Sequence, residues 1–175
     1  MSICVHPFDP ESFNYRVAEF TTLQALSYGL LAPMSCFTDI LLMCLYATKS
    51  LLREPPGDVI LWQMIGQLVL DLGWMYPGFH FYLYQNIGDG PICKTISLSS
   101  IYSVTICCGY NVALVFEIFQ KISQPFSMSY DRRKWGYHLL THGIAVLCTL
   151  SAAVTGSVGV TGAQHCFLQL TPYGQ

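Results

Sequence analysis

The sequence predicts an all-α membrane protein, a transmembrane helical bundle of four spans. Only 10% of its 175 residues are charged and 53% are apolar or aromatic, whereas about 25% of the residues of an ordinary soluble protein are charged. The apolar residues stand in four long runs, each near or above the roughly 20 residues that a helix needs to cross a bilayer. Period-two alternation of apolar and polar residues is absent, which argues against a membrane β-barrel.

The expected spans cover about residues 23–47, 58–84, 96–119 and 136–160. Together they form a four-helix transmembrane region over residues 21–168. An extracellular N-terminal tail precedes it at residues 1–20, and a C-terminal stub follows at residues 169–175. The lipid bilayer is therefore the first partner that the sequence predicts.

The connections between the spans have the composition of turns. In the first connection, Pro55, Pro56 and Gly57 block helix continuation, and Asp58 is placed to cap the second span. The second connection reads NIGDGP over residues 86–91. The third is polar and is interrupted by Pro125.

Basic residues predict the orientation. Of the eight Lys and Arg residues, six fall in the first and third connections: Lys49, Arg53, Lys121, Arg132, Arg133 and Lys134. Because cytoplasmic loops carry the excess of basic residues, these connections are expected in the cytoplasm and the N-terminus outside, most naturally at the plasma membrane. Arg132, Arg133 and Lys134 are also candidates for contact with a cytoplasmic partner or with lipid, although a topology signal explains the same cluster.

Eight cysteines divide by depth. Five lie inside the expected spans, where a thiol behaves as a small apolar group. Cys4, Cys93 and Cys166 lie on the outer side, which in a surface membrane is oxidising. Cys93 stands at the head of the third span and Cys166 follows the outer end of the fourth, so neighbouring helices would bring them together. We predict a Cys93–Cys166 disulfide, with Cys4 left over.

Four polar side chains are expected at membrane depth: Asp39, Asp71, Asn111 and Glu117. A charge in the bilayer centre costs several kcal/mol, so such residues face a bundle interior or a water-filled cavity. Each is a candidate for a polar switch between two packed states. The alternative is that each is hydrogen-bonded to a neighbouring helix and only holds the bundle together, and this alternative is the stronger one for Asn111.

Prolines and aromatic residues mark the outer half of the bundle. Pro33 and Pro77 fall inside helical runs, where a proline kinks the helix. Trp74 and His80 could then line an outer ligand cavity. The alternative, favoured for Tyr82 and Tyr84, is an aromatic belt at the membrane interface.

Motifs of enzymes and of cofactor sites are absent from the sequence. It contains no glycine-rich phosphate loop, no HExxH and no recognisable Ser/His/Asp grouping. His138 and His142 have the spacing of metal ligands on a helix, but two nitrogens alone do not make a metal site. We therefore expect no enzyme activity, no cofactor, no metal and, given the lack of a long basic run, no nucleic-acid partner.

Several of these features resemble the first half of a seven-helix G-protein-coupled receptor over residues 20–168. The outer cysteines lie 73 residues apart, and Glu117 follows Cys93 by 24 residues, as does the acid at the inner end of the third helix in rhodopsin-like receptors. Leu70, Asp71 and Leu72 resemble the Asp-Leu pattern of receptor second helices. Residues 137–143 (YHLLTHG) resemble the start of the fourth helix in slime-mould cyclic-AMP receptors. That group and the secretin-like receptors are the nearest in pattern.

The resemblance implies an extracellular ligand and, for a full-length protein, a heterotrimeric G protein as partner. Ile118 replaces the arginine of the rhodopsin-like Glu-Arg-Tyr motif, His142 replaces a tryptophan, and Ala145 replaces a proline. The chain also has four expected spans where receptors have seven, so the resemblance implies a fragment, a truncated product or a divergent relative. Two other hypotheses stay open: a four-helix structural subunit of a membrane complex, and a transporter or channel fragment in which Asp39 and Asp71 carry protons or cations.

Overall fold

The computed structural model describes residues 23, 26–84, 90–123, 130–160 and 166–168. The long helices are α2 (Ala32–Thr48), α3 (Gly57–Tyr84), α4 (Pro91–Ser123) and α5 (Tyr130–Thr155). A π-helical turn, η1 (Ser27–Leu31), leads into α2, and a 3₁₀ turn, η2 (Ser50–Arg53), follows it. Two short antiparallel strands, β1 (Val158–Val160) and β2 (Cys166–Leu168), come after α5, with Val158 opposite Leu168.

All four helical segments are long and apolar enough to cross a membrane: Ser27–Thr48, Gly57–His80, Pro91–Ser123 and Arg133–Thr155. The predicted all-α, four-span fold is thereby confirmed, and the chain is a multi-pass membrane protein. Its lipid-facing surface has the expected character. Leu139 and Val154 are 80% and 87% exposed on α5, an arrangement that is stable where the surrounding solvent is hydrocarbon.

The ends of two helices differ from the expected spans. The third helix begins at Pro91 rather than near residue 96, because proline is favoured in the first turn of a helix, where its missing N–H costs nothing. The fourth helix ends at Thr155, and residues 158–160, which were expected to be helical, form β1. Gly156 explains this end, since its φ of 63° is a left-handed conformation that terminates helices and that glycine adopts without strain.

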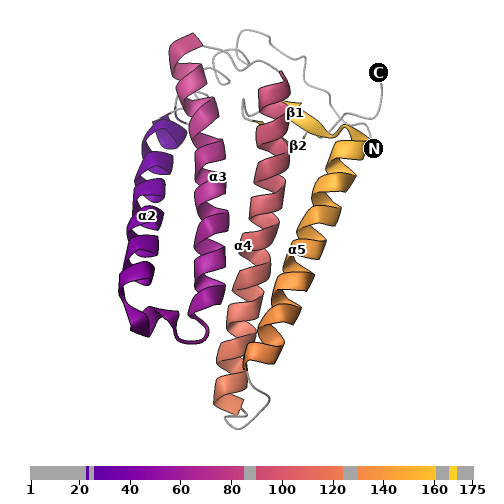
Figure 1. Cartoon of the computed structure of the whole chain (residues 1–175). Helices are drawn as coiled ribbons and strands as arrows, with labels where there is room; N and C mark the ends of the chain where they lie inside the picture. The colour runs from indigo at the N-terminus through magenta and orange to yellow at the C-terminus, as the bar shows by residue number, and fades with distance from the viewer. Residues whose placement is uncertain (1–22, 24–25, 85–89, 124–129, 161–165, 169–175) are drawn as a thin grey trace, which may run out of the picture.

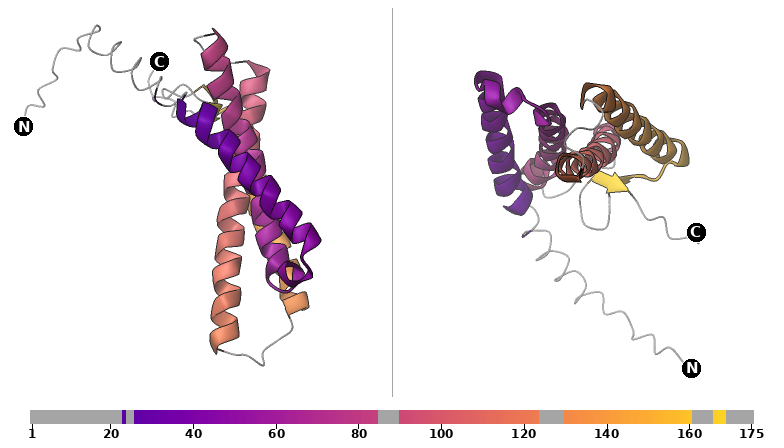
Figure 2. Two further views of the ribbon diagram at one scale, coloured as in Figure 1. Left: turned by 90° about the vertical axis from the view of Figure 1, so that its left-hand side faces the viewer. Right: turned by 90° about the horizontal axis from the view of Figure 1, so that it is seen from below.

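The helices stand in a row that follows their order in the sequence. Each packs mainly on its sequence neighbour, so that α2 and α5 lie at opposite ends of the row and α4 lies between α3 and α5 (Figure 1; Figure 2, right). The strands lie beside the first turns of α4, at the end of the helix bundle opposite to η2 (Figure 1).

The helices α4 and α5 pack closely at Gly109. A Cβ atom built on Gly109 of α4 would lie 2.6 Å from Cγ2 of Thr141 on α5, so the two backbones approach closely only because this position lacks a side chain. Small residues at such crossings are typical of membrane helices. The main core lies around this contact and consists of Val59, Ile106, Tyr110, Ala113 and Ala145.

Candidate functional site

A disulfide ties the head of α4 to β2. The Cα atoms of Cys93 and Cys166 are 5.2 Å apart, within the roughly 7 Å that a disulfide allows, and both residues are 1% exposed. The bond was predicted between these two residues. It holds the β1–β2 hairpin against the beginning of α4, so the hairpin lies at that end of the helix bundle. Cys4 lies outside the described residues.

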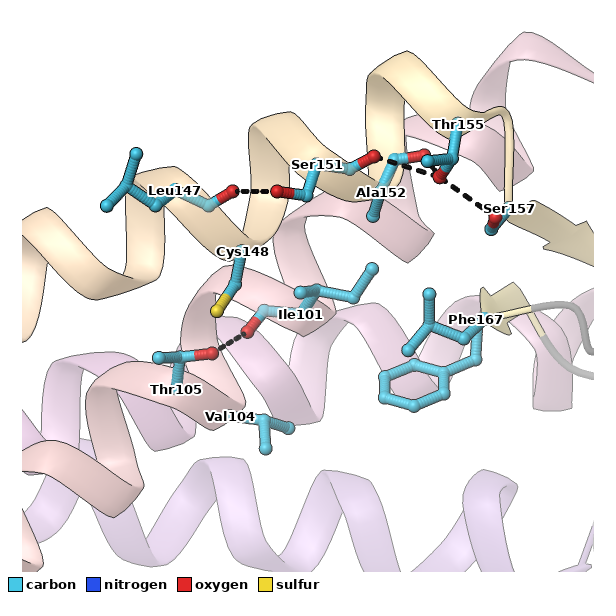
Figure 3. A pocket seen from close by; sticks show the side chains of 11 residues that line it. Ile101, Val104, Thr105, Leu147, Cys148, Ser151, Ala152, Thr155, Ser157 and Phe167 are labelled. Atoms are coloured by element: carbon cyan, nitrogen blue, oxygen red, sulfur yellow. Dashed lines mark hydrogen bonds between the residues drawn. The ribbon is translucent and has the colours of Figure 1, made fainter.

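An apolar groove of about 600 Å³ lies between α4, α5 and this hairpin (Figure 3). Ile101, Val104 and Leu147 line it, with Phe167 of β2 at its hairpin end. The hydroxyl groups of its helices bond to backbone carbonyls of the same helix, as Thr105 does to Ile101 at 2.8 Å, and the Ser157 hydroxyl donates to that of Thr155 at 2.9 Å (Figure 3). With its polar atoms thus engaged, the groove suits a hydrocarbon chain rather than acid–base chemistry.

Two carboxyl groups lie together in the interior between α2 and α3. Asp39 and Asp71 are 8% and 3% exposed, and they are close enough for their charges to interact. Gln67 donates from Nε2 to Oδ1 of Asp71 over 3.1 Å. Both residues were expected to face the interior, and the structure places them against one another.

A cavity of about 380 Å³ adjoins this acid pair between η1, α2 and α3. Asp71 and Trp74 line it, and Trp74 packs against Tyr28 with ring centroids 5.6 Å apart. Among the described residues, the second carboxyl oxygens of Asp39 and Asp71 and the Nε1 of Trp74 are buried without a hydrogen-bond partner. Buried polar atoms require partners, so the cavity is equipped to bind water, a proton or a small polar ligand.

His80 was a candidate, with Trp74, for the lining of an outer cavity. The described lining of this cavity does not include His80. Its ring instead packs against Tyr76, with centroids 5.4 Å apart, because it lies on a different face of α3 from Asp71 and Trp74. The side chains of Tyr82 and Tyr84 lie outside the described part of the structure. Among the described residues, no group of three or more potential metal ligands occurs.

A buried ion pair joins the last turns of α4 to the first turn of α5, at the end of the bundle far from the disulfide. Glu117 is 1% exposed, and its carboxylate accepts from Arg133 Nε at 2.8 Å, from Arg133 Nη2 at 2.9 Å and from the Tyr137 hydroxyl at 2.5 Å. Two parallel bonds to one guanidinium are the strongest form of such a pair. Arg133 was expected on the surface as a partner contact, and it points into the helix row because Glu117 lies buried one helix away.

The other expected site residues are on the surface or unplaced. Lys134 pairs with Asp131 at 2.9 Å in an exposed contact, and the side chain of Arg132 lies outside the described part of the chain. Asn111 was expected in the interior, but it lies on the exposed face of α4 beside Val112 and Val115. The helix rotation set by the Gly109–Thr141 contact turns Asn111 away from α5.

Sequence reasoning missed a chain of tyrosine and histidine side chains between α4 and α5. The Tyr110 hydroxyl lies 2.5 Å from His138 Nδ1 and 3.0 Å from His142 Nε2, and the Tyr102 hydroxyl lies 2.9 Å from His142 Nδ1. Trp62 of α3 packs perpendicular to both imidazoles. The i, i+4 spacing of the histidines showed that they share a face, but no pattern in the sequence indicated their partners.

Comparison of the sequence with models of known protein families and with curated proteins gave no match.

Proposed function

We propose that this chain is the first half of a seven-helix receptor of the G-protein-coupled type, acting in cell-surface signalling. The observation that carries the proposal is the disulfide from the head of α4 to β2 of the hairpin that follows α5. A bond at this place in the chain is the pattern that the outer cysteines share with these receptors. It also gives the outer end of the helix row a fixed wall, as a site for an extracellular ligand requires.

The open row of helices supports the same proposal. Asn111 lies beside Val112, Val115 and Phe119 on an exposed face of α4. A polar side chain at membrane depth is costly when it faces lipid and favourable when it meets another helix. In the proposed receptor, further helices pack on this face of α4.

In the proposed receptor, the polar groups have different roles at different depths in the membrane. A ligand enters from the outer side, where Trp74 lines the cavity beside Asp71. The acid pair of Asp39 and Asp71 responds by changing its proton or its packing, because a switch needs contacts that differ between two states. At the inner end, the Glu117–Arg133 pair holds α4 and α5 next to the surface that a G protein would contact.

The deciding experiment starts from the extended transcript, in which we expect three further apolar spans. The full-length protein, reconstituted with heterotrimeric G proteins, is assayed for guanine-nucleotide exchange. Asp71→Asn keeps the shape of the side chain, and we expect normal surface expression with exchange altered by about fivefold or more, the lower end of usual allosteric coupling. Gln63→Asn, on the same helix, is the control. A complete transcript with four spans, or an Asp71→Asn protein with unchanged exchange, contradicts the proposal.

Orientation has its own test. The positive-inside rule places residue 129 in the cytoplasm. A cysteine introduced at this position, in a background where the exposed native thiols are replaced, should react with an impermeant maleimide only after the membrane is permeabilised. Labelling in intact cells would overturn the orientation and the receptor proposal together.

A further inference from the structure

The receptor proposal does not use the tyrosine–histidine chain between α4 and α5. It consists of Tyr102 and Tyr110 on α4 and His138 and His142 on α5, joined by three contacts of 2.5–3.0 Å. Tyr110 is 0% exposed, and its hydroxyl bridges the two imidazoles. We propose that this chain is a binding site for one proton, held between α4 and α5 and shared by His138 and His142 through the Tyr110 hydroxyl.

The hydrogen-bond pattern allows two arrangements when both imidazoles are neutral. In the first, His138 Nδ1–H donates to Tyr110, the Tyr110 hydroxyl donates to His142 Nε2, and His142 Nδ1–H donates to Tyr102. In the second, every bond is reversed. Each group has the one donor and one acceptor that either direction requires. The chain can therefore be reversed without the loss of a bond.

The first arrangement leaves the lone pair of His138 Nε2 available, and a proton can bind there. The Nδ1 proton of His138 then passes to the Tyr110 oxygen as the Tyr110 hydrogen passes to His142 Nε2. At the end His138 is neutral with its proton on Nε2, and His142 is an imidazolium that donates to both tyrosines. Tyr110 donates to His138 Nδ1, so all three contacts remain and one positive charge has been gained.

A second proton has no such place. With both imidazoles charged, the Tyr110 oxygen would accept from both rings and its own hydrogen would have no acceptor in the chain. The two cations would also face each other as stacked rings with centroids 6.3 Å apart. The geometry thus sets the capacity of the site at one proton.

Aromatic and charged side chains lie around the histidine pair. The Trp62 ring packs edge-to-face with both imidazoles, and its centroid lies 5.7 Å from that of His138 and 5.4 Å from that of His142. Among the described residues, Asp58 of α3 and Lys134 of α5 are the charged side chains whose fields act on His138, with opposite signs. Tyr102 and Tyr110 of α4 are further titratable neighbours.

In this proposal the proton enters from the end of the helix bundle where Asp58 and Tyr130 lie. His138 lies eight residues into α5 and His142 twelve, which places them about 12 Å and 18 Å along the helix axis from Tyr130. His138 is therefore the entry point, and His142 is the deeper holder of the charge. Because the donors and acceptors belong to different helices, the proton links local pH to the contact between α4 and α5.

The experiment is a ¹⁵N NMR titration of the whole protein in lipid nanodiscs. Its histidine rings are labelled, and their signals are assigned with the variants His138→Gln and His142→Gln. Between pH 9 and pH 5 we expect the signals of both rings to move with one common midpoint and to sum to one proton. His80, on α3, serves as the control in the same spectrum. Separate midpoints, a sum of two protons, or no change over this range would overturn the proposal.

Two matched variants test the bridge. Tyr110→Phe keeps the aromatic ring but removes the shared hydroxyl, so we expect the common midpoint to split into two. Tyr102→Phe removes a hydroxyl at the end of the chain and should leave one midpoint. A Tyr110→Phe protein that titrates like the wild type would contradict sharing through Tyr110. The wild-type titration decides the matter by itself if this variant does not fold.

Discussion

The Glu117–Arg133 ion pair provides the strongest stability prediction. Arg133→Gln removes two donors from a carboxylate that is 1% exposed, and among the described residues only the Tyr137 hydroxyl still donates to it. Breaking a fully buried pair costs roughly 3–5 kcal/mol because the remaining charge stays buried and unpaired. The Arg133 side chain is 19% exposed, so we expect a somewhat smaller loss of about 2–4 kcal/mol in the free energy of unfolding.

The measurement is unfolding of the purified protein by SDS in mixed micelles, followed by circular dichroism. In the Glu117→Gln/Arg133→Gln double variant both charges are gone, and we expect at least half of the loss to be recovered, since an uncharged pair leaves no buried ion. Lys134→Gln, which breaks an exposed contact, is the control and should not change the stability measurably. A loss for Arg133→Gln no larger than that of this control, or strict additivity of the two substitutions, would refute the reasoning.

Three further predictions use the same unfolding assay. Cys93→Ser removes the disulfide and should lower the free energy of unfolding by about 2–4 kcal/mol. A reducing agent should lower the stability of the wild type to that of this variant and should leave the variant unchanged. Gly109→Ala places a Cβ atom 2.6 Å from Thr141 and should cost about 1–3 kcal/mol; Gly143→Ala, which meets nothing within 4 Å, should cost nothing. Burial and the carboxylate that its hydroxyl contacts raise the pKa of Tyr130 above its ordinary value of about 10. The stability that follows is complete below pH ~10 and is lost as the pH rises above it, whereas Tyr130→Phe should lack this loss; equal alkaline profiles would contradict the assignment.

The fold was predictable because its causes are local. A helix in hydrocarbon satisfies its own backbone hydrogen bonds, so an apolar run of sufficient length specifies a span without reference to the rest of the chain. The disulfide followed almost as directly, since the order of the spans places Cys93 and Cys166 at the same end of neighbouring helices. The boundary at Thr155 was missed because one left-handed glycine, Gly156, ended the helix inside an apolar run.

The side-chain partners could not be predicted in the same way. In a soluble helix an apolar stripe marks the face that turns inward, but here both the lipid-facing and the interior faces are apolar. The sequence alone therefore determined how many times the chain crosses the membrane, where it does so and which outer cysteines pair. Only the tertiary structure decided how each helix is rotated about its axis, which turned Asn111 outward, brought Arg133 in to Glu117 and placed Tyr110 between two histidines. Those rotations depend on close packing between helices, as at Gly109 and Thr141, which composition does not reveal.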